Sequence, residues 1–346
     1  MPQPVPSASA LVMESSARSI LEGKAKPPQS LGLLEDWAVQ LAVLQKTLTP
    51  RIQKGTLLVV CADHGVVQNR VAGVDSVSAY PARVSAVVYR ALKDGKAAGA
   101  VLAHSIGLEL VLRDVGINWN PESDPEPRVF AGTRDFTVEP AMDPEACKIA
   151  MNAGREEVAK LEHSQVVCIG EVGIGNTTSA SALICALTSA PAAQVCGRGT
   201  GLDDLGILRK IAAVEKAIDL HRAALTDPVR TLECLGGLEI AAMVGAILEA
   251  YERRIAVIVD GFISCAAALT AFKINPECKQ AMFFSHKSVE SGVVFVFREL
   301  NVKSVLDLEF RLGEGTGAVL AYPILKAAGD MMCDMISLQE ALETYG

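Results

Sequence analysis

The chain has 346 residues, of which 50% are hydrophobic and 21% are charged, and these proportions exclude a generally disordered chain because they support a large apolar core. Its formal net charge of −8 excludes a surface built to bind nucleic acid, since such surfaces neutralise phosphates with Lys and Arg. Any phosphate that the protein binds is therefore expected on a small ligand.

In chain order, the sequence begins with a Pro-, Ser- and Ala-rich stretch, residues 1–10, that has neither the basic region nor the apolar run of a signal peptide. No later window reaches the roughly 18 apolar residues that a membrane span needs. Nine Cys are scattered along the chain without a CxxC pair or the Cys/His spacing of a metal site, so we expect reduced thiols. These features predict a cytoplasmic protein with neither membrane nor nucleic-acid partners.

Helical spacing of apolar residues marks both ends of the chain, at residues 15–48 and 323–345. We expect these two segments to pack together as a smaller helical lobe. The predicted large domain is 50–320, and the predicted small domain combines 1–49 with 321–346.

Between these ends, five short runs rich in β-branched residues have the length of strands buried on both faces. Ala-, Leu-, Glu- and Lys-rich stretches with helical spacing, such as 208–220 and 238–251, lie among them. The alternation predicts an α/β fold with a parallel sheet flanked by helices. The Pro-rich piece 120–128 is predicted to be a loop. The strand candidates are 57–61, 108–115, 166–169, 256–259 and 281–284.

Gly, a carboxylate or His follows each strand candidate. In parallel sheets, ligands bind beyond the carboxyl ends of the strands, so we expect the functional site at this edge. Asp63 and His64 lack a ligand spacing such as HExxH, and no metal site is predicted. The strand-end residues are Asp63, Asp114, Glu171, Asp260 and His286.

The segment 170–178 is glycine-rich and leads from a strand into a helix. Glycines let the backbone approach a ligand closely, and the free N–H groups of a helix start favour an anion. The segment is neither a Walker loop nor a dinucleotide fingerprint. Taken alone, it is equally consistent with a purely structural turn. Its candidate binding residues are Gly173, Gly175, Asn176, Thr177 and Thr178.

A second glycine-rich element, 197–204, also precedes a helix and includes Gly199. The alternative interpretation is an Asp that caps the helix after a flexible loop. Two such helix starts in one chain nevertheless indicate a phosphate or ribose site.

The segment 311–317 sets Glu314 among three glycines, directly before an apolar stretch. A Glu in the first turn of a helix can simply complement the helix dipole. The functional interpretation is a general base on a backbone that can come close to a substrate.

Taken together and in order, these segments resemble the nicotinate-nucleotide:dimethylbenzimidazole phosphoribosyltransferase family, which activates the lower ligand in cobamide assembly. The resemblance runs from about residue 26 to residue 328, most of the chain. Its motifs are 26–32, 62–66, 77–81, 170–178, 197–204, 236–241, 260–262, 285–288 and 311–317.

The resemblance implies a Rossmann-like large domain, a small helical domain from the two chain ends, a dimer, and no metal or organic cofactor. It also implies a reaction. Phosphoribose would pass from nicotinate mononucleotide to an aromatic base, releasing nicotinate and giving an α-ribotide for the nucleotide loop of a cobamide of the vitamin B12 type.

The same resemblance implies roles for particular residues. Glu314 would be the general base, with Glu171 as a second catalytic carboxylate. Lys210, Glu239 and Asp260 fall on positions that line the family's active site. The remaining substrate-binding candidates are Gly173 to Thr178, Gly199, Ser291 and Gly292 for the ribose phosphate, and Ser78, Tyr80 and Val88.

The sequence departs from the family near the acceptor. The link 66–77 is a few residues longer than usual, and Val87 and Val88 stand where the family commonly has a Gln near the bound base. A more apolar pocket is expected, and a phenol needs fewer polar partners than a benzimidazole. Some anaerobic relatives work as heterodimers and activate phenol or p-cresol. Phenol or p-cresol as acceptor, and a heterodimer with a paralogous subunit, are therefore hypotheses beside dimethylbenzimidazole and a homodimer.

Two other function classes stay open. A paralogue that keeps the fold could serve as a non-catalytic partner of an active chain, although Glu314 and both glycine elements are intact here. A nucleotide-binding oxidoreductase on a similar sheet is disfavoured because the dinucleotide fingerprint is missing.

Overall fold

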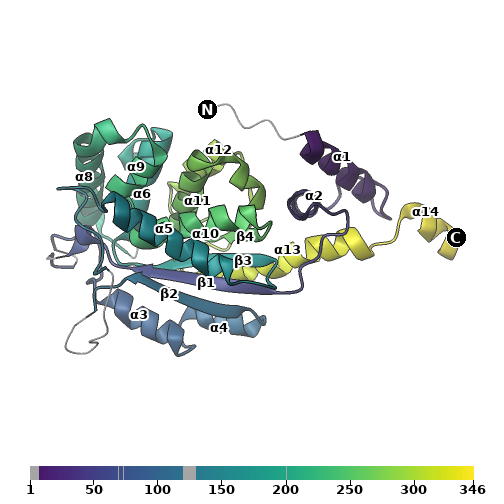
Figure 1. The fold of residues 1–346 in the computed structure, drawn as a ribbon, viewed down its shortest axis with the longest axis horizontal. Helices are drawn as coiled ribbons and strands as arrows, with labels where there is room; N and C mark the ends of the chain where they lie inside the picture. The colour runs from purple at the N-terminus through teal and green to yellow at the C-terminus, as the bar shows by residue number, and fades with distance from the viewer. Residues whose placement is uncertain (1–7, 69, 73, 120–129, 200) are drawn as a thin grey trace.

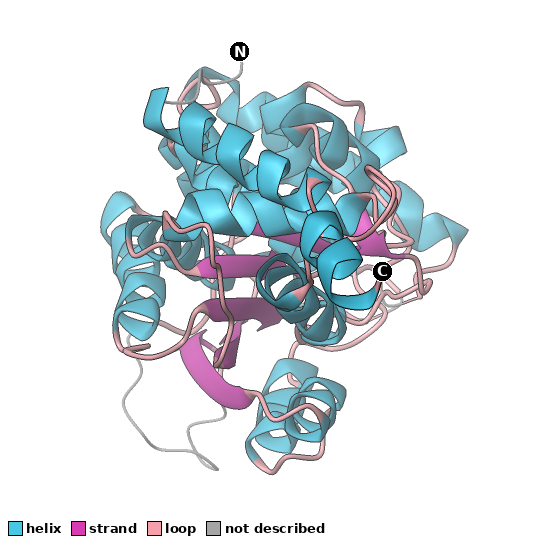
Figure 2. Ribbon diagram, turned by 90° about the vertical axis from the view of Figure 1, so that its right-hand side faces the viewer, coloured by secondary structure: helices cyan, strands magenta, loops and turns pink. Residues whose placement is uncertain are grey.

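The computed structural model describes residues 8–68, 70–72, 74–119, 130–199 and 201–346. Within these residues, six parallel strands form one sheet in the order β2-β1-β3-β4-β5-β6, and helices cover both faces (Figures 1 and 2). The predicted Rossmann-like α/β fold is confirmed. The strands are β1 (Gly55–Ala62), β2 (Glu109–Gly116), β3 (Val166–Val172), β4 (Ala256–Val259), β5 (Met282–His286) and β6 (Ser304–Leu306).

The inner strands are apolar on both sides because both sides are covered. Every residue of β1 and of β3 is buried, whereas the edge strand β2 is mostly half-buried. Strand β1 lies between β2 and β3, so the order of the strands reverses at this point. In doubly wound sheets, a crevice opens beyond the carboxyl ends of the two strands where the order reverses.

Three helices, α5 (Pro144–Ala159), α10 (Leu238–Glu252) and α11 (Phe262–Ile274), lie on one face of the sheet, and α3 (Val84–Lys93) and α4 (Ala98–Ser105) lie on the other (Figure 1). Helix α13 (Thr316–Asp334) contacts α4, β3 and β5. The other helices are α6 (Asn176–Thr188), α7 (Ala192–Val195), α8 (Asp204–His221), α9 (Pro228–Leu235) and α12 (Val293–Leu300), with 3₁₀ turns at Gly65–Val67, Arg222–Ala224 and Pro276–Ala281.

The two ends of the chain lie side by side. Helices α1 (Ala8–Glu22) and α2 (Leu33–Gln45) lie beside the end of α13 and near α14 (Leu338–Tyr345), and an isolated β-bridge pairs Lys24 with Ser337 (Figure 1). Trp37 of α2 packs edge-on against Phe283 of β5 with ring centroids 5.4 Å apart. Helix α2 is thus packed onto the sheet.

Helix α13 runs across the predicted domain boundary between residues 320 and 321. It begins beside the strand ends and ends among the terminal helices, so the predicted boundary falls inside one continuous helix. The division into two domains stays a prediction. The predicted loop 120–128 lies outside the described residues. No helix in the described parts of the chain is long and apolar enough to cross a lipid bilayer.

Candidate active site

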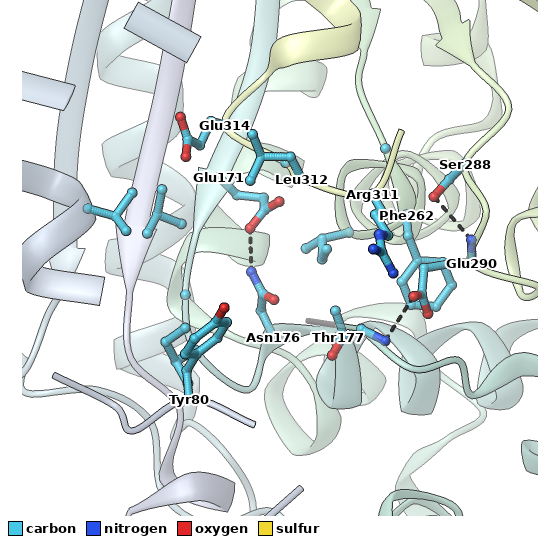
Figure 3. A pocket seen from close by; sticks show the side chains of 18 of the residues that line it. Tyr80, Glu171, Asn176, Thr177, Phe262, Ser288, Glu290, Arg311, Leu312 and Glu314 are labelled. Atoms are coloured by element: carbon cyan, nitrogen blue, oxygen red, sulfur yellow. Dashed lines mark hydrogen bonds between the residues drawn. The ribbon is translucent and has the colours of Figure 1, made fainter. Parts of the chain in front are cut away.

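A cleft opens beyond the carboxyl ends of the strands, where the strand order reverses (Figure 3). It brings together residues from β3, α3, the two glycine-rich elements, and the loops after β4, β5 and β6. The strand-end residue His286 lines it, as do eight of the predicted catalytic and substrate-binding residues: Tyr80, Val88, Glu171, Gly173, Asn176, Thr177, Gly199 and Glu314.

Glu314 projects from a backbone loop of unusual conformation. Gly313, Glu314 and Gly315 have φ values of +91°, +58° and +76°, a left-handed run that costs little for glycine but strains a Glu. Its carboxylate Oε2 accepts a hydrogen bond from the backbone N–H of Gly99 at 2.9 Å, and its own N–H donates to the carbonyl of Glu171 at 3.2 Å. The strained loop therefore holds a buried carboxylate at the cleft wall in a fixed direction.

Glu171, at the end of β3, is the second carboxylate of the cleft. Its Oε2 accepts a hydrogen bond from the side-chain amide of Asn176 (Figure 3). Burial, and then the neighbouring charges of Glu239 and Asp260, raise the pKa of Glu171 well above its ordinary value. Glu171 is thus the carboxyl group of the cleft best suited to keep a proton at neutral pH.

Asp260 lies behind the loop that carries Glu314. Its carboxylate accepts backbone N–H donors from Gly315 at 3.2 Å, Gly317 at 2.7 Å and Ala318 at 3.0 Å, and so caps the start of α13. Burial raises the pKa of Asp260 to about 7. Asp260 acts on the cleft through this loop, because the lining residues described by the structure do not include it.

The first glycine-rich element forms a turn that opens α6. Gly175, with φ +99°, precedes the helix, and Asn176 and Thr177 of the first turn face the cleft. The N–H groups of Asn176 and Thr178 donate to the carbonyls of Gly173 and Gly175 within the turn, while the positive end of the helix dipole at this start attracts anions. The turn therefore supplies a surface suited to a phosphate.

Lys210 of α8 connects the two glycine-rich elements from behind. Its ammonium group donates to Thr177 Oγ1 at 2.9 Å and to the carbonyl of Gly197 at 3.1 Å. The side chain is fully buried, and this burial lowers the pKa of Lys210. Only the side chain of Thr177 separates its ammonium group from the cleft.

The structure does not bring every predicted residue to the cleft. Glu239 is fully buried and bonds to His64, while Ser78 is buried with its hydroxyl accepting from the N–H of Tyr80. Ser291 is exposed, and Gly292 caps α12 against Phe262. Gly175 lies in the glycine-rich turn, and Thr178 lies in the first turn of α6 behind it. Predicted residues absent from the described lining are Ser78, Gly175, Thr178, Lys210, Glu239, Asp260, Ser291 and Gly292.

Comparison with known proteins decides what kind of site this is. A family model described as phosphoribosyltransferase matches residues 7–342. The nicotinate-nucleotide–dimethylbenzimidazole phosphoribosyltransferase of Pseudomonas aeruginosa is 42% identical over 321 residues, covering 91% of this chain and 90% of the relative. The chain belongs to the nicotinate-nucleotide:dimethylbenzimidazole phosphoribosyltransferase family. The resemblance inferred from the ordered motifs is confirmed.

Other relatives agree. The enzyme of the same name from Chloroflexus aggregans is 40% identical over 332 residues, covering 94% of this chain and 92% of the relative. The crystal structure of the Thermus thermophilus enzyme of that name has a TM-score of 0.87 and 35% identity, with 97% of this chain and 99% of that chain covered. The protein is therefore a phosphoribosyltransferase, an enzyme of the pentosyltransferase class.

The cleft of this phosphoribosyltransferase also contains residues that the sequence did not single out as site candidates. Ser288 and Glu290 come from the loop after β5, where Ser288 Oγ accepts from the N–H of Glu290 and Glu290 Oε1 accepts from the N–H of Gly199 (Figure 3). Phe262 and Arg311 complete this side. Ser288 and Arg311 lie inside the motifs 285–288 and 311–317. Their place in these motifs was the sequence signal that could have identified them as site residues.

Proposed function

We propose that this phosphoribosyltransferase transfers phosphoribose from nicotinate mononucleotide to an aromatic base, with release of nicotinate and formation of an α-ribotide used in cobamide assembly. The observation that carries the proposal is the pairing, in one cleft, of a fixed carboxylate with an anion-binding helix start. Glu314 supplies the carboxylate, and the Gly173–Thr177 turn supplies the helix start. The names of the relatives make 5,6-dimethylbenzimidazole the first acceptor to test.

The phosphate of the donor fits the side of the cleft where positive side chains and the start of α6 lie together. Thr177 at the start of α6, Lys210 behind it, and Arg311 on the facing loop all favour an anion there. A phosphate held at this side would fix the ribose and leave its anomeric carbon between the two carboxylates.

The carboxylates suit the charge changes of the reaction. Departure of the pyridine from nicotinate mononucleotide leaves a cation-like ribose carbon, which the carboxylate of Glu314 stabilises as the charge develops, whereas Glu171, whose pKa is raised, is suited to donate a hydrogen bond. The acceptor nitrogen attacks that carbon from the opposite face and must then lose its proton. We assign proton removal to Glu314, because its carboxylate faces the cleft and its direction is fixed by Gly99.

A phenol or p-cresol acceptor is a second candidate, which the apolar lining favours. Val84 and Val88 of α3 line the cleft with Tyr80 and Leu312. A phenol places one hydroxyl near the base and leaves the rest of its ring for apolar contact. Glu314 would then take the hydroxyl proton in place of a ring N–H proton.

The test is a chromatographic assay with the purified chain. Nicotinate mononucleotide is incubated separately with dimethylbenzimidazole, adenine, phenol and p-cresol, and nicotinate release and new α-ribotides are measured. Product with any base supports the reaction, and the ranking of kcat/KM values selects the acceptor class. Absence of product with every base would contradict the proposal and favour a non-catalytic partner of a second, paralogous chain. Size measurement of the chain alone and with such a partner would then distinguish a homodimer from a heterodimer.

A further inference from the structure

His64 and Glu239 form a hydrogen-bonded pair beneath the cleft floor. Both side chains are fully buried, and His64 Nε2 lies 2.7 Å from Glu239 Oε1. They come from distant parts of the chain, the turn after β1 and the start of α10. In the part of the chain that the structure describes, neither side chain lines the cleft, so the pair does not contact a bound substrate directly.

Hydrogen bonds also tie the pair to α6. Ser179 Oγ of α6 lies 3.1 Å from His64 Nδ1 and donates to the carbonyl of Gly236 at 3.1 Å. His64 therefore lies between Glu239 and the helix that follows the glycine turn.

The contact to His64 is also the hydrogen bond that holds Glu239. Glu239 Oε2 has no hydrogen-bond partner among the described residues. A buried carboxyl oxygen without a partner makes the contact to His64 the main restraint on this side chain. Loss of His64 would leave the Glu239 carboxyl group buried and unpaired.

The glycine turn of the cleft lies above this pair. A Cβ on Gly173 would first meet the carbonyl oxygen of Ala62 at 2.6 Å and then Glu239 Oε1 and His64 Cδ2, both at 3.4 Å. One on Gly175 would meet Val67 Cγ1 at 3.0 Å and His64 Cβ at 3.2 Å. The pair is thus part of the surface beneath the turn, together with Ala62 and Val67. It leads into Asn176, whose amide bonds to the catalytic carboxyl candidate Glu171.

We propose that the His64–Glu239 pair is a positioning unit for phosphoribosyl transfer: it fixes the turn 173–175 and, through Asn176, the orientation of Glu171. This inference rests on the proposed function. His64 is a positioning residue and not a catalytic one, since it reaches the substrate only through the turn.

The test compares four variants with the wild type in the nicotinate mononucleotide assay. His64→Asn retains an amide near Nδ1 but cannot reach Glu239, and kcat is expected to fall about tenfold or more, with a higher KM for the nucleotide. His64→Gln places an amide donor near the former Nε2, and most of the loss is expected to be recovered. In the double variant that combines His64→Asn with Glu239→Gln, the loss of kcat should be no larger than in His64→Asn alone, because the two residues act as a unit.

Met332→Ala is the matched control for stability, since Met332 is buried in α13 far along the helix from the cleft. This control should lower the melting temperature without changing kcat or KM. Unchanged kinetics in His64→Asn, a larger loss in the double variant than in His64→Asn, or equal losses in His64→Gln and His64→Asn would each overturn the proposal.

Failure of the proposed function gives a different result, because the wild type would then form no ribotide with any base. In that case calorimetry with nicotinate mononucleotide replaces turnover, and weaker binding by about tenfold in His64→Asn but not in Met332→Ala supports the pair as a positioning unit. A wild type that neither reacts with nor binds the nucleotide overturns both inferences.

Discussion

The carboxylate of Glu314 accepts a hydrogen bond from the backbone N–H of Gly99 at 2.9 Å, so the first turn of α4 holds the candidate base. Gly99 also lies against the Glu314 backbone, where a Cβ would come within 2.4 Å of the Glu314 carbonyl oxygen. The residue that holds the base therefore has to be a glycine, although it lies 215 positions away in the sequence.

Gly99→Ala tests this contact. The added methyl group has to push the 313–315 loop away, so we expect kcat to fall about tenfold or more while KM for the nucleotide changes less. Gly23→Ala is the matched control, because a Cβ there meets its neighbours at an ordinary 3.6 Å and lies far from the cleft. Equal kinetics for the two alanine variants would contradict the prediction.

Glu314→Gln tests the assignment of the base. The amide oxygen of Gln can still accept from Gly99, so the fold should persist with a melting temperature within about 2 °C of the wild type. Turnover should fall about 100-fold or more, because an amide cannot take the acceptor proton. The measurements are thermal unfolding and initial rates with saturating substrates. Near-normal turnover in a well-folded variant would refute the assignment.

Val88→Gln tests the acceptor side of the cleft. A polar amide on α3 adds a hydrogen-bond partner for a benzimidazole nitrogen and reduces apolar contact with a cresol ring. We expect the ratio of kcat/KM for dimethylbenzimidazole to that for p-cresol to rise about threefold or more, a change of roughly 0.7 kcal/mol. Val101→Gln, at an exposed position on α4, is the control. A ratio that stays constant would remove Val88 from the acceptor pocket.

His286 gives a prediction for stability against pH. Burial lowers the pKa of His286 from 6.5 to about 4, so the folded protein keeps a neutral ring in a range where the unfolded chain binds a proton. Its contribution to stability is complete above pH 6.5 and is lost as the pH falls towards 4, in total about 3 kcal/mol. The free energy of unfolding of the wild type minus that of His286→Gln should fall by this amount between pH 7 and pH 4 in urea titrations. A difference that does not depend on pH would show that burial does not depress this pKa.

The sheet and the cleft edge could be predicted because they follow from local patterns. Buried strands read as short apolar runs, and chemistry-bearing residues such as Glu171 follow them directly. Strand β6 is absent from the predicted strands, because its three residues Ser304–Leu306 are only half-buried at the edge of the sheet and give little periodic signal.

The inner arrangement of the site could not be predicted in the same way. Lys210, Glu239 and Asp260 were expected beside a ligand, yet none is in the described lining of the cleft, and they contact Thr177, His64 and the Glu314 loop respectively. Whether a polar side chain ends in a cleft or one layer behind it depends on tertiary packing, which a strand-end pattern does not encode. The same limit applies to Ser291, which is exposed, and Ser288, which lies in the cleft three positions earlier.

Helix α13 has 19 residues, with the strained loop of Glu314 at its first turn and the terminal helices packed around its last turns. At 1.5 Å per residue the helix spans roughly 28 Å, so one element joins the cleft to the remote contact with α2. The Glu314 loop has its own anchors at Gly99 and Asp260, which do not depend on that far end. In a selection for altered activity, improved variants should therefore arise around these anchors and the cleft lining, while changes in the remote helix contact should alter stability alone.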